Sequence, residues 1–272
     1  MISTDLHLHS LWSPDGQEPL SHIFSECAAK NLTHIAITDH LDLHDPSGDE
    51  GVKDLDRYLA DIEYTGRNFP TMEILKGLEA GVNKDNLQET ESLIAPHKFD
   101  VILLSIHVFN KINVAKPLPY LDSVSFIKAY LEETLFCVTH MEQYQVLAHL
   151  DYPARYTAFT LKDYVQNADL VEEVLRTLIE RRKALELNTA RLDKSENFKI
   201  MQWILQQYTN LGGYMVTVGS DAHKLEAIGR NFDRAKQLLS LVGLDKLTVF
   251  EDTRPKLISW TSYSVKLQDP NY

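Results

Sequence analysis

The stretch TDLHLHSLWSPDG, residues 4–16, places two histidines two positions apart and follows them with a Pro–Asp–Gly turn. In a β-strand, residues i and i+2 face the same side, so we expect His7 and His9 to share one face with Asp5 and the intervening leucines to share the other. Adjacent imidazoles repel each other when charged and lose hydration when buried and neutral. A metal ion between them removes both penalties, so this stretch predicts a strand that ends at a metal site.

The same arrangement recurs along the chain, where a short apolar run ends in polar residues and an amphipathic stretch follows. The apolar runs are residues 2–9, 32–40, 72–80, 99–107, 144–151, 184–190 and 214–223. Strand–helix alternation of this kind predicts an α/β protein with a parallel sheet. Because His, Asp and Glu gather at the C-terminal ends of these runs, where (β/α) barrels carry their active sites, we expect a (β/α)7 TIM-like barrel.

The composition excludes several classes of function. The 272 residues are 44% hydrophobic and carry a formal net charge of −12, which argues against binding to nucleic acid. We find neither a secretory signal nor a membrane-spanning run, and Cys27 and Cys137 lie in helix-like segments unlike a thiolate metal site or a disulfide framework. We therefore expect a single cytoplasmic domain over residues 1–272, with no nucleic-acid, membrane or obligate protein partner.

Nine potential metal ligands follow the predicted strands. They are His7, His9, Asp15, His40, Glu79, His107, His149, Asp221 and His223. Imidazoles and carboxylates without thiolates suit Zn, Fe or Mn with open positions for water and substrate. Nine ligands exceed the needs of one ion, so two or three ions that share a carboxylate are expected. Clustered divalent cations favour hydrolysis at phosphorus.

The motifs DLHLHS, ITDH, GLE, SIH, AHLD and GSDAH, in this order between residues 5 and 223, resemble those of the polymerase and histidinol phosphatase (PHP) family of metal-dependent phosphoesterases. The length and the segment GSDAH…GRNFDRA resemble the histidinol-phosphatase type within that family. The resemblance implies a distorted (β/α)7 barrel. It also implies that L-histidinol phosphate, an intermediate of histidine biosynthesis, is hydrolysed by a metal-bridging hydroxide in a trinuclear site.

The resemblance assigns the ligands to three divalent cations. It implies the sets His7, His9, Glu79 and Asp221; Glu79, His107 and His149; and Asp15, His40 and His223. Glu79 then bridges the first two ions. The resemblance also implies that Glu79, Asp221 and His223 are catalytic.

Residues that bind the substrate carry a weaker signal. Three arginines near strand ends are candidates for holding phosphate: Arg155, Arg191 and Arg230. Asp42, Asn188 and Asp151 are candidates for holding an amine or orienting a ligand, and the sequence does not choose among them. The loop 41–53 is expected over the mouth of the site, and the loop 107–122 is expected to contribute to specificity.

Three alternatives stay open. The first is a phosphoesterase of the same family that acts on another small phosphomonoester or a nucleotide. The second is a non-catalytic, metal-stabilised interaction domain, and the complete ligand set argues against this alternative. The third is a metal-dependent amidohydrolase, but such enzymes commonly place a lysine where this chain has Glu79.

Overall fold

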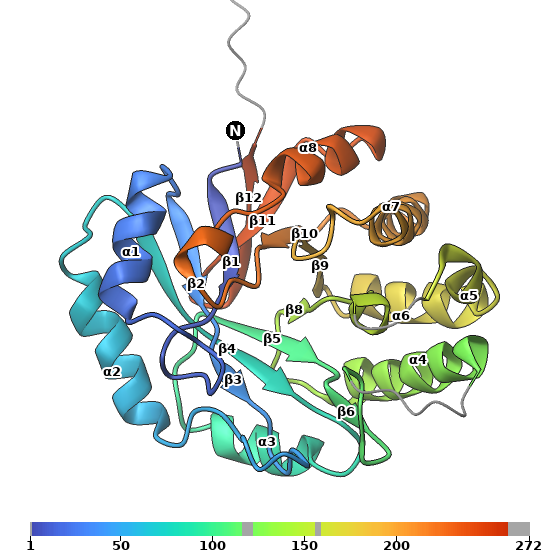
Figure 1. The fold of residues 1–272 in the computed structure, drawn as a ribbon, viewed down its shortest axis with the longest axis horizontal. Helices are drawn as coiled ribbons and strands as arrows, with labels where there is room; N and C mark the ends of the chain where they lie inside the picture. Colours follow the sequence, from blue (N-terminus) through green and yellow to red (C-terminus); the bar gives the residue numbers. More distant parts are fainter. Residues whose placement is uncertain (1, 116–121, 156–158, 261–272) are drawn as a thin grey trace, which may run out of the picture.

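Seven parallel strands form the wall of a nearly closed barrel in this computed structural model, which describes residues 2–115, 122–155 and 159–260 (Figure 1). In spatial order they are β1 (Thr4–Leu8), β2 (His34–Ile37), β4 (Glu73–Gly81), β5 (Val101–Ser105), β8 (Val146–Leu147), β9 (Ala184–Asn188) and β10 (Val216–Gly219). The first and last strands meet at their C-terminal ends, where the amide of Asp221 donates to the carbonyl of His7 at 2.8 Å. The predicted α/β barrel is confirmed.

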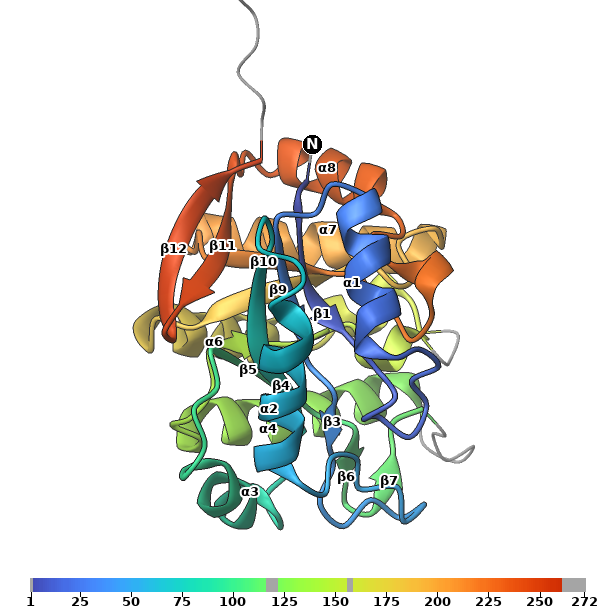
Figure 2. The same cartoon turned by 90° about the vertical axis from the view of Figure 1, so that its left-hand side faces the viewer.

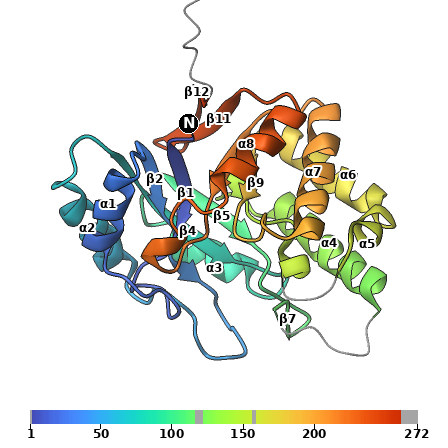
Figure 3. The ribbon, with the colours of Figure 1, turned by 45° about the horizontal axis from the view of Figure 1, so that its top comes forward.

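Helices surround this wall on the outside (Figures 1 and 3). They are α1 (Leu20–Ala29), α2 (Leu55–Gly66), α3 (Leu87–Ile94), α4 (Ser123–His140), α5 (Leu161–Val165), α6 (Ala168–Glu180), α7 (Ser195–Asn210) and α8 (Phe232–Leu241), with 3-10 turns at Tyr152–Arg155 and Leu225–Ala227. The first helix buries Leu20, Ile23, Phe24 and Cys27, the face that its i, i+3, i+4, i+7 spacing predicts. None of the helices in the described part of the chain is long and apolar enough to cross a membrane.

The interior of the barrel is apolar near the N-terminal ends of the strands. Inward-facing side chains such as Leu75, Leu103 and Ala184 form one cluster there, and Val249 and Phe250 join it from strand β11. The hairpin of β11 (Lys246–Glu251) and β12 (Arg254–Ser259) stands at one edge of the molecule (Figure 2). Farther along the strands the same inward faces carry polar residues, so the polar site is confined to the C-terminal end.

A bulge in β1 overturns the simple alternation expected for residues 5–8. Asp5 pairs with Ile35 and Leu8 pairs with Ile37, so β1 advances three positions while its partner β2 advances two. Leu6 therefore joins the interior cluster while Leu8 packs in the outer cluster beneath the helices. The carboxylate of Asp5 accepts instead from the backbone amides of Ser220 and Gly229, at 2.7 and 3.1 Å. Asp5 thus does not share the face of His7, because a bulge reverses side-chain direction.

Short elements frame the mouth of the barrel. Strand β3 (His40–Leu41) pairs with β4 in parallel and places His40 opposite Glu79. Strands β6 (Val108–Phe109) and β7 (Ile112–Asn113) form a hairpin directly after β5. Part of the loop 107–122 that we expected to affect specificity lies outside the described residues.

Candidate metal centre

Glu79, at the C-terminal end of β4, lies at the centre of the polar end of the barrel and is 1% exposed. Its Oε1 lies 2.6 Å from Nε2 of His149 and 3.2 Å from Nε2 of His107. The hydroxyl of Ser105 donates to the same oxygen at 2.7 Å. One oxygen of this carboxylate therefore serves the β5 and β8 side of the barrel.

The second oxygen of Glu79 faces the β1 and β3 side. Its Oε2 lies 3.2 Å from Nε2 of His7, 3.4 Å from Nε2 of His9 and 3.0 Å from Nδ1 of His40. A single carboxylate thus separates two groups of imidazoles. This geometry fits the bridging role that the sequence predicts for Glu79.

Asp221, directly after β10, approaches the same histidines from the other side. Its Oδ1 lies 3.4 Å from Nε2 of His9 and 3.8 Å from Nε2 of His7. Asp221 has a positive φ of 53°, which is uncommon for a residue other than glycine. Asp221 thus places its carboxylate beside the imidazoles of His7 and His9.

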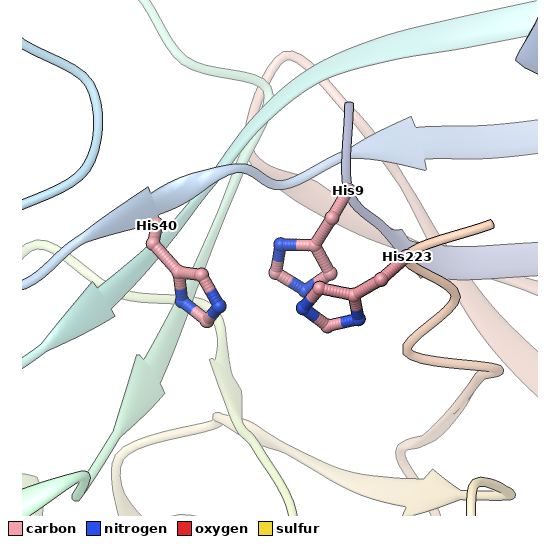
Figure 4. Close-up of side chains that lie close together, drawn as sticks. All are labelled: His9, His40 and His223. Carbon is pink, nitrogen blue, oxygen red and sulfur yellow. The ribbon is translucent and has the colours of Figure 1, made fainter. Parts of the chain in front are cut away.

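Asp15, His40 and His223 form an outer group near the mouth. Oδ1 of Asp15 lies 3.6 Å from Nε2 of His40, and Oδ2 lies 3.0 Å from Nε2 of His223. Figure 4 shows the rings of His9, His40 and His223 turned toward one another, and those of His9 and His223 stack with centroids 4.0 Å apart. The structure therefore brings all nine predicted ligands into one cluster.

These residues fit a group of metal ions. Among the described residues, the buried side-chain atoms that find no hydrogen-bond partner include Nε2 of His7, Nε2 of His9, Nδ1 of His40, Oε2 of Glu79 and Nε2 of His223. Unpartnered buried polar atoms are costly, and here they face one another. Sets of three such donors lie within 4.8 Å, among them His7–His9–Glu79, Glu79–His107–His149 and His9–His40–His223. Imidazole and carboxylate donors suit Zn, Fe or Mn.

Burial and neighbouring carboxylates shift the pKa values of the cluster in both directions. Burial acts to lower the pKa of four histidines, but neighbouring carboxylates outweigh it and raise the pKa of His7, His40, His107 and His223, so a metal ion would replace a proton on these rings. Burial acts to raise the pKa of the Glu79 carboxyl, but the imidazoles of His7 and His107 outweigh it and hold this pKa well below its ordinary value. Burial is the main cause that lowers the pKa of His9 well below its usual value and also lowers that of His149. An ionised carboxylate and neutral imidazoles are the forms that bind metals.

A cavity of about 390 Å³ opens beside Asp221 and is lined by all three predicted arginines. Arg155 is buried, and its Nη1 lies 2.5 Å from Oδ2 of Asp221, while its Nε and Nη2 find no partner among the described residues. Arg230 donates from Nε and Nη2 to the carbonyls of Ser220 and Asp221, at 2.9 and 2.8 Å. Arg191 is exposed at the rim of the cavity.

A second cavity, of about 270 Å³, also borders the cluster, and Asp15 lines both cavities. It is lined by His40 and His107 together with the acidic side chains of Asp42, Asp45 and Asp49. The last three belong to the loop 41–53, which therefore borders the mouth as expected. The cluster of predicted ligands thus borders one cavity lined by arginines and one lined by aspartates.

Two carboxylates contact the Nδ1 atoms of predicted histidine ligands. Oδ1 of Asp42 lies 2.8 Å from Nδ1 of His107, so this residue orients a predicted ligand, a role that the sequence left open among several residues. Glu186, in β9, lies 2.7 Å from Nδ1 of His7 and was missed altogether. The signal available for Glu186 was its strand position, two residues before Asn188, which gives both the same inward face.

Comparisons with known proteins agree with this geometry. The family model described as PHP domain matches residues 5–190. A protein of Clostridium acetobutylicum named "Probable histidinol-phosphatase" is 33% identical over 86% of this chain and 91% of its own length. A protein of Lactococcus lactis named "Histidinol-phosphatase" is 30% identical over 92% of this chain and 95% of its own length.

The fold comparison gives a similar result. A crystal structure of histidinol phosphate phosphatase from Lactococcus lactis, complexed with zinc, L-histidinol and phosphate, superposes with a TM-score of 0.86. It is 28% identical in sequence, and the match covers 93% of this chain and 98% of that one. Family model, sequence relatives and fold agree over most of the chain, and this chain belongs to the PHP domain family.

Proposed function

We propose that this protein is a histidinol-phosphatase, which hydrolyses L-histidinol phosphate to L-histidinol and phosphate. The observation that carries the proposal is the buried Glu79 carboxylate, surrounded by imidazoles, next to a cavity lined with arginines. The two relatives and the solved structure described above carry the same activity in their names. The enzyme would act in histidine biosynthesis in the cytoplasm, as one domain over residues 1–272.

Three divalent cations, Zn, Fe or Mn, are proposed to occupy the cluster. The ligand sets are His7, His9, Glu79 and Asp221; Glu79, His107 and His149; and Asp15, His40 and His223. Bound divalent cations supply Lewis acidity, bring the pKa of water toward neutrality and neutralise negative charge on phosphate. Three residues are proposed as catalytic because they would hold these cations in place: Glu79, Asp221 and His223.

The arginines are proposed to hold the phosphate oxygens that face away from the cluster. The geometry of Arg155 supports this role best, because two of its nitrogens are buried without a hydrogen-bond partner among the described residues and the side chain lines the 390 Å³ cavity. Arg230 is held by two backbone carbonyls and adds positive charge at a fixed place. Arg191 is exposed and lines the same cavity, where its guanidinium is proposed to contact the bound anion.

The distribution of charge at the mouth also fits the rest of this substrate. L-histidinol phosphate carries an anionic phosphate at one end and an ammonium group and an imidazole at the other. The cavity with Asp42, Asp45 and Asp49 borders the same cluster as the cavity with the arginines, and Asp15 lines both, so a molecule with opposite charges at its ends can span the two. A simple sugar phosphate has no cationic end for this side.

The test is phosphate release after metal reconstitution, measured with L-histidinol phosphate beside p-nitrophenyl phosphate, glycerol phosphate and a nucleoside monophosphate. We expect kcat/KM to be highest for L-histidinol phosphate. A higher kcat/KM for one of the other compounds would favour the alternative, a PHP phosphoesterase for another phosphomonoester or nucleotide.

A further inference from the structure

Glu186 is a buried carboxylate in the wall of the barrel, behind the proposed metal ligands. It is the middle residue of β9 and is 1% exposed. Its neighbours on either side, Leu185 and Leu187, pack in the outer apolar cluster, so Glu186 faces the interior. None of the donor sets that could hold a metal among the described residues includes it. Its role therefore lies in what it does to its neighbours.

Three hydrogen-bond donors converge on the two oxygens of Glu186. Nδ1 of His7 lies 2.7 Å from Oε1. The backbone amide of His149 donates to Oε2 at 2.8 Å, and Nδ2 of Asn188 donates to the same oxygen at 3.1 Å. The Asn188 amide cannot turn over without loss, because its Oδ1 accepts from the backbone amide of Ala190 at 3.0 Å.

We infer that Glu186 is a positioning residue that sets the tautomer of His7 and thereby prepares it to bind metal, an inference that rests on the metal centre of the proposed function. A carboxylate only accepts hydrogen bonds, so Nδ1 of His7 carries the hydrogen. In the neutral ring that binds a metal, the lone pair is then on Nε2, which points at Glu79 and Asp221 and finds no hydrogen-bond partner among the described residues. Carboxylates behind metal-binding histidines act in this way in other proteins.

The contact between Glu186 and His7 depends on the glycine beside it. Gly219 in β10 pairs with Asn188 of β9. A Cβ atom at Gly219 would lie 2.3 Å from Oε1 of Glu186 and 2.4 Å from Cβ of His7, closer than real Cβ contacts. Only glycine leaves room for the carboxylate to reach the imidazole, so the arrangement involves three strands, β1, β9 and β10.

Replacing the carboxylate by an amide of the same shape creates a conflict that cannot be resolved. If the amide oxygen takes the place of Oε2, it satisfies the donors of His149 and Asn188, but the NH2 group then faces Nδ1 of His7. The hydrogen of His7 must move to Nε2, where it blocks metal binding. If the amide is turned over, His7 keeps its tautomer, but NH2 faces two buried donors that lose their acceptor. Both outcomes weaken the metal site.

The experiment compares Glu186→Gln with Glu186→Asp by their affinity for metal, measured with zinc against a competing chelator. The visible spectrum of the cobalt-substituted protein and the Tm of the metal-free protein are measured beside it. Glu186→Gln keeps the size and adds a donor, whereas Glu186→Asp shortens the side chain but keeps it an acceptor. We expect metal affinity to fall in the order wild type, Glu186→Asp, Glu186→Gln. The loss in Glu186→Gln should be about tenfold to a hundredfold, with an altered cobalt spectrum.

Glu133 supplies the matched control. It is also a buried glutamate, 3% exposed, and it accepts from the backbone amide of Lys84 at 2.6 Å on the α4 side of the molecule. Glu133→Gln and Glu133→Asp should change the Tm of the metal-free protein and leave metal affinity and the cobalt spectrum unchanged.

The reverse order at position 186, with Glu186→Asp weaker in metal binding than Glu186→Gln, would mean that Glu186 acts by filling space and would overturn the inference. If Glu186→Gln fails to fold, Glu186→Asp decides alone, since a loss beyond about tenfold in its metal affinity contradicts a role that depends on acceptor chemistry. A metal-loaded wild type that releases no phosphate from L-histidinol phosphate would refute the proposed function and leave this comparison of affinities intact.

Discussion

Glu79 offers one oxygen to each of two groups of histidines, and a neutral amide cannot replace it. We predict that Glu79→Gln lowers kcat/KM by more than about a hundredfold, the loss that even an outer partner of a metal ligand can cause. An amide has one acceptor oxygen and no charge, so it is a weaker ligand and cannot bridge as a carboxylate does. Phosphate release together with elemental analysis of the purified variant measures both effects.

His97 and His140 provide the controls for Glu79. Nδ1 of His97 lies 3.1 Å from Asp56, and Nδ1 of His140 lies 2.8 Å from the carbonyl of Phe136, both away from the cluster. We expect His97→Ala and His140→Ala to keep wild-type kcat within about twofold, as for surface substitutions. A loss at either position as large as that of Glu79→Gln, with the fold intact, would show that the ligand assignment is wrong.

Substitution of Arg155 and of Arg191 should have different effects on metal affinity. Charge-assisted hydrogen bonds contribute about 1.5–3 kcal/mol, so each change to alanine should lower kcat/KM by about tenfold to a hundredfold. Arg191→Ala should keep its metal. Arg155→Ala should also lose metal affinity, because Nη1 of Arg155 lies 2.5 Å from Asp221 and holds that proposed ligand in place.

The check is kcat/KM with L-histidinol phosphate beside the metal content of each variant. Arg176→Ala, on the outer surface of α6, serves as the control for loss of one positive charge. Unchanged kcat/KM in both Arg155→Ala and Arg191→Ala would leave phosphate binding to the metal ions alone.

Among the secondary-structure elements, helix α2 is linked to the barrel wall by hydrogen bonds of the Tyr58 hydroxyl. Its hydroxyl accepts from the amide of Asp39 at 3.1 Å and lies within 3.1 and 3.0 Å of the carbonyls of Ile37 and Gly77. Tyr58→Phe leaves the buried Asp39 amide without an acceptor. We predict a loss of about 1–3 kcal/mol in unfolding free energy, which lowers Tm by about 2–10 °C.

Tyr64 lies on the same helix and gives a matched control, since its side chain is 70% exposed. Tyr64→Phe should leave Tm unchanged, and both variants are compared by thermal unfolding of the metal-loaded protein. Equal Tm for Tyr58→Phe and wild type would mean that another group satisfies the Asp39 amide.

Over the protein as one unit, the proposed metal ions would join strands that are far apart in sequence. The ends of three different strands contribute buried ligands to the cluster: Glu79, His149 and Asp221. A ligand present at a thousandfold excess over its Kd stabilises the folded state by about 4 kcal/mol, so chelation should lower Tm by about 10 °C. Re-addition of zinc should restore Tm. An unchanged Tm after chelation would contradict the prediction that bound metal stabilises the C-terminal end of the barrel.

The number of ions is a separate prediction. Nine ligands in one cluster lead us to expect two to three divalent ions per chain, as measured by elemental analysis of active protein. At most one ion per chain in fully active protein would rule out the trinuclear arrangement.

Patterns in the sequence were enough to predict the barrel and the nine residues that the structure brings into one cluster. Parallel strands bring their C-terminal ends to one place, so residues such as His7, Glu79 and His223 could be collected from their positions after apolar runs. Amphipathic spacing also predicted the buried face of α1 correctly. These features depend on local periodicity, which is present in the chain before it folds.

Only the tertiary structure decided how these residues are supported. The bulge that turns Asp5 outward depends on the pairing of β1 with β2, and the role of Glu186 depends on the approach of β1, β9 and β10 at Gly219. The pairing of Arg155 with Asp221 joins residues 66 positions apart. Such contacts follow from the three-dimensional packing of distant strands, and no periodicity in the sequence encodes which oxygen meets which donor.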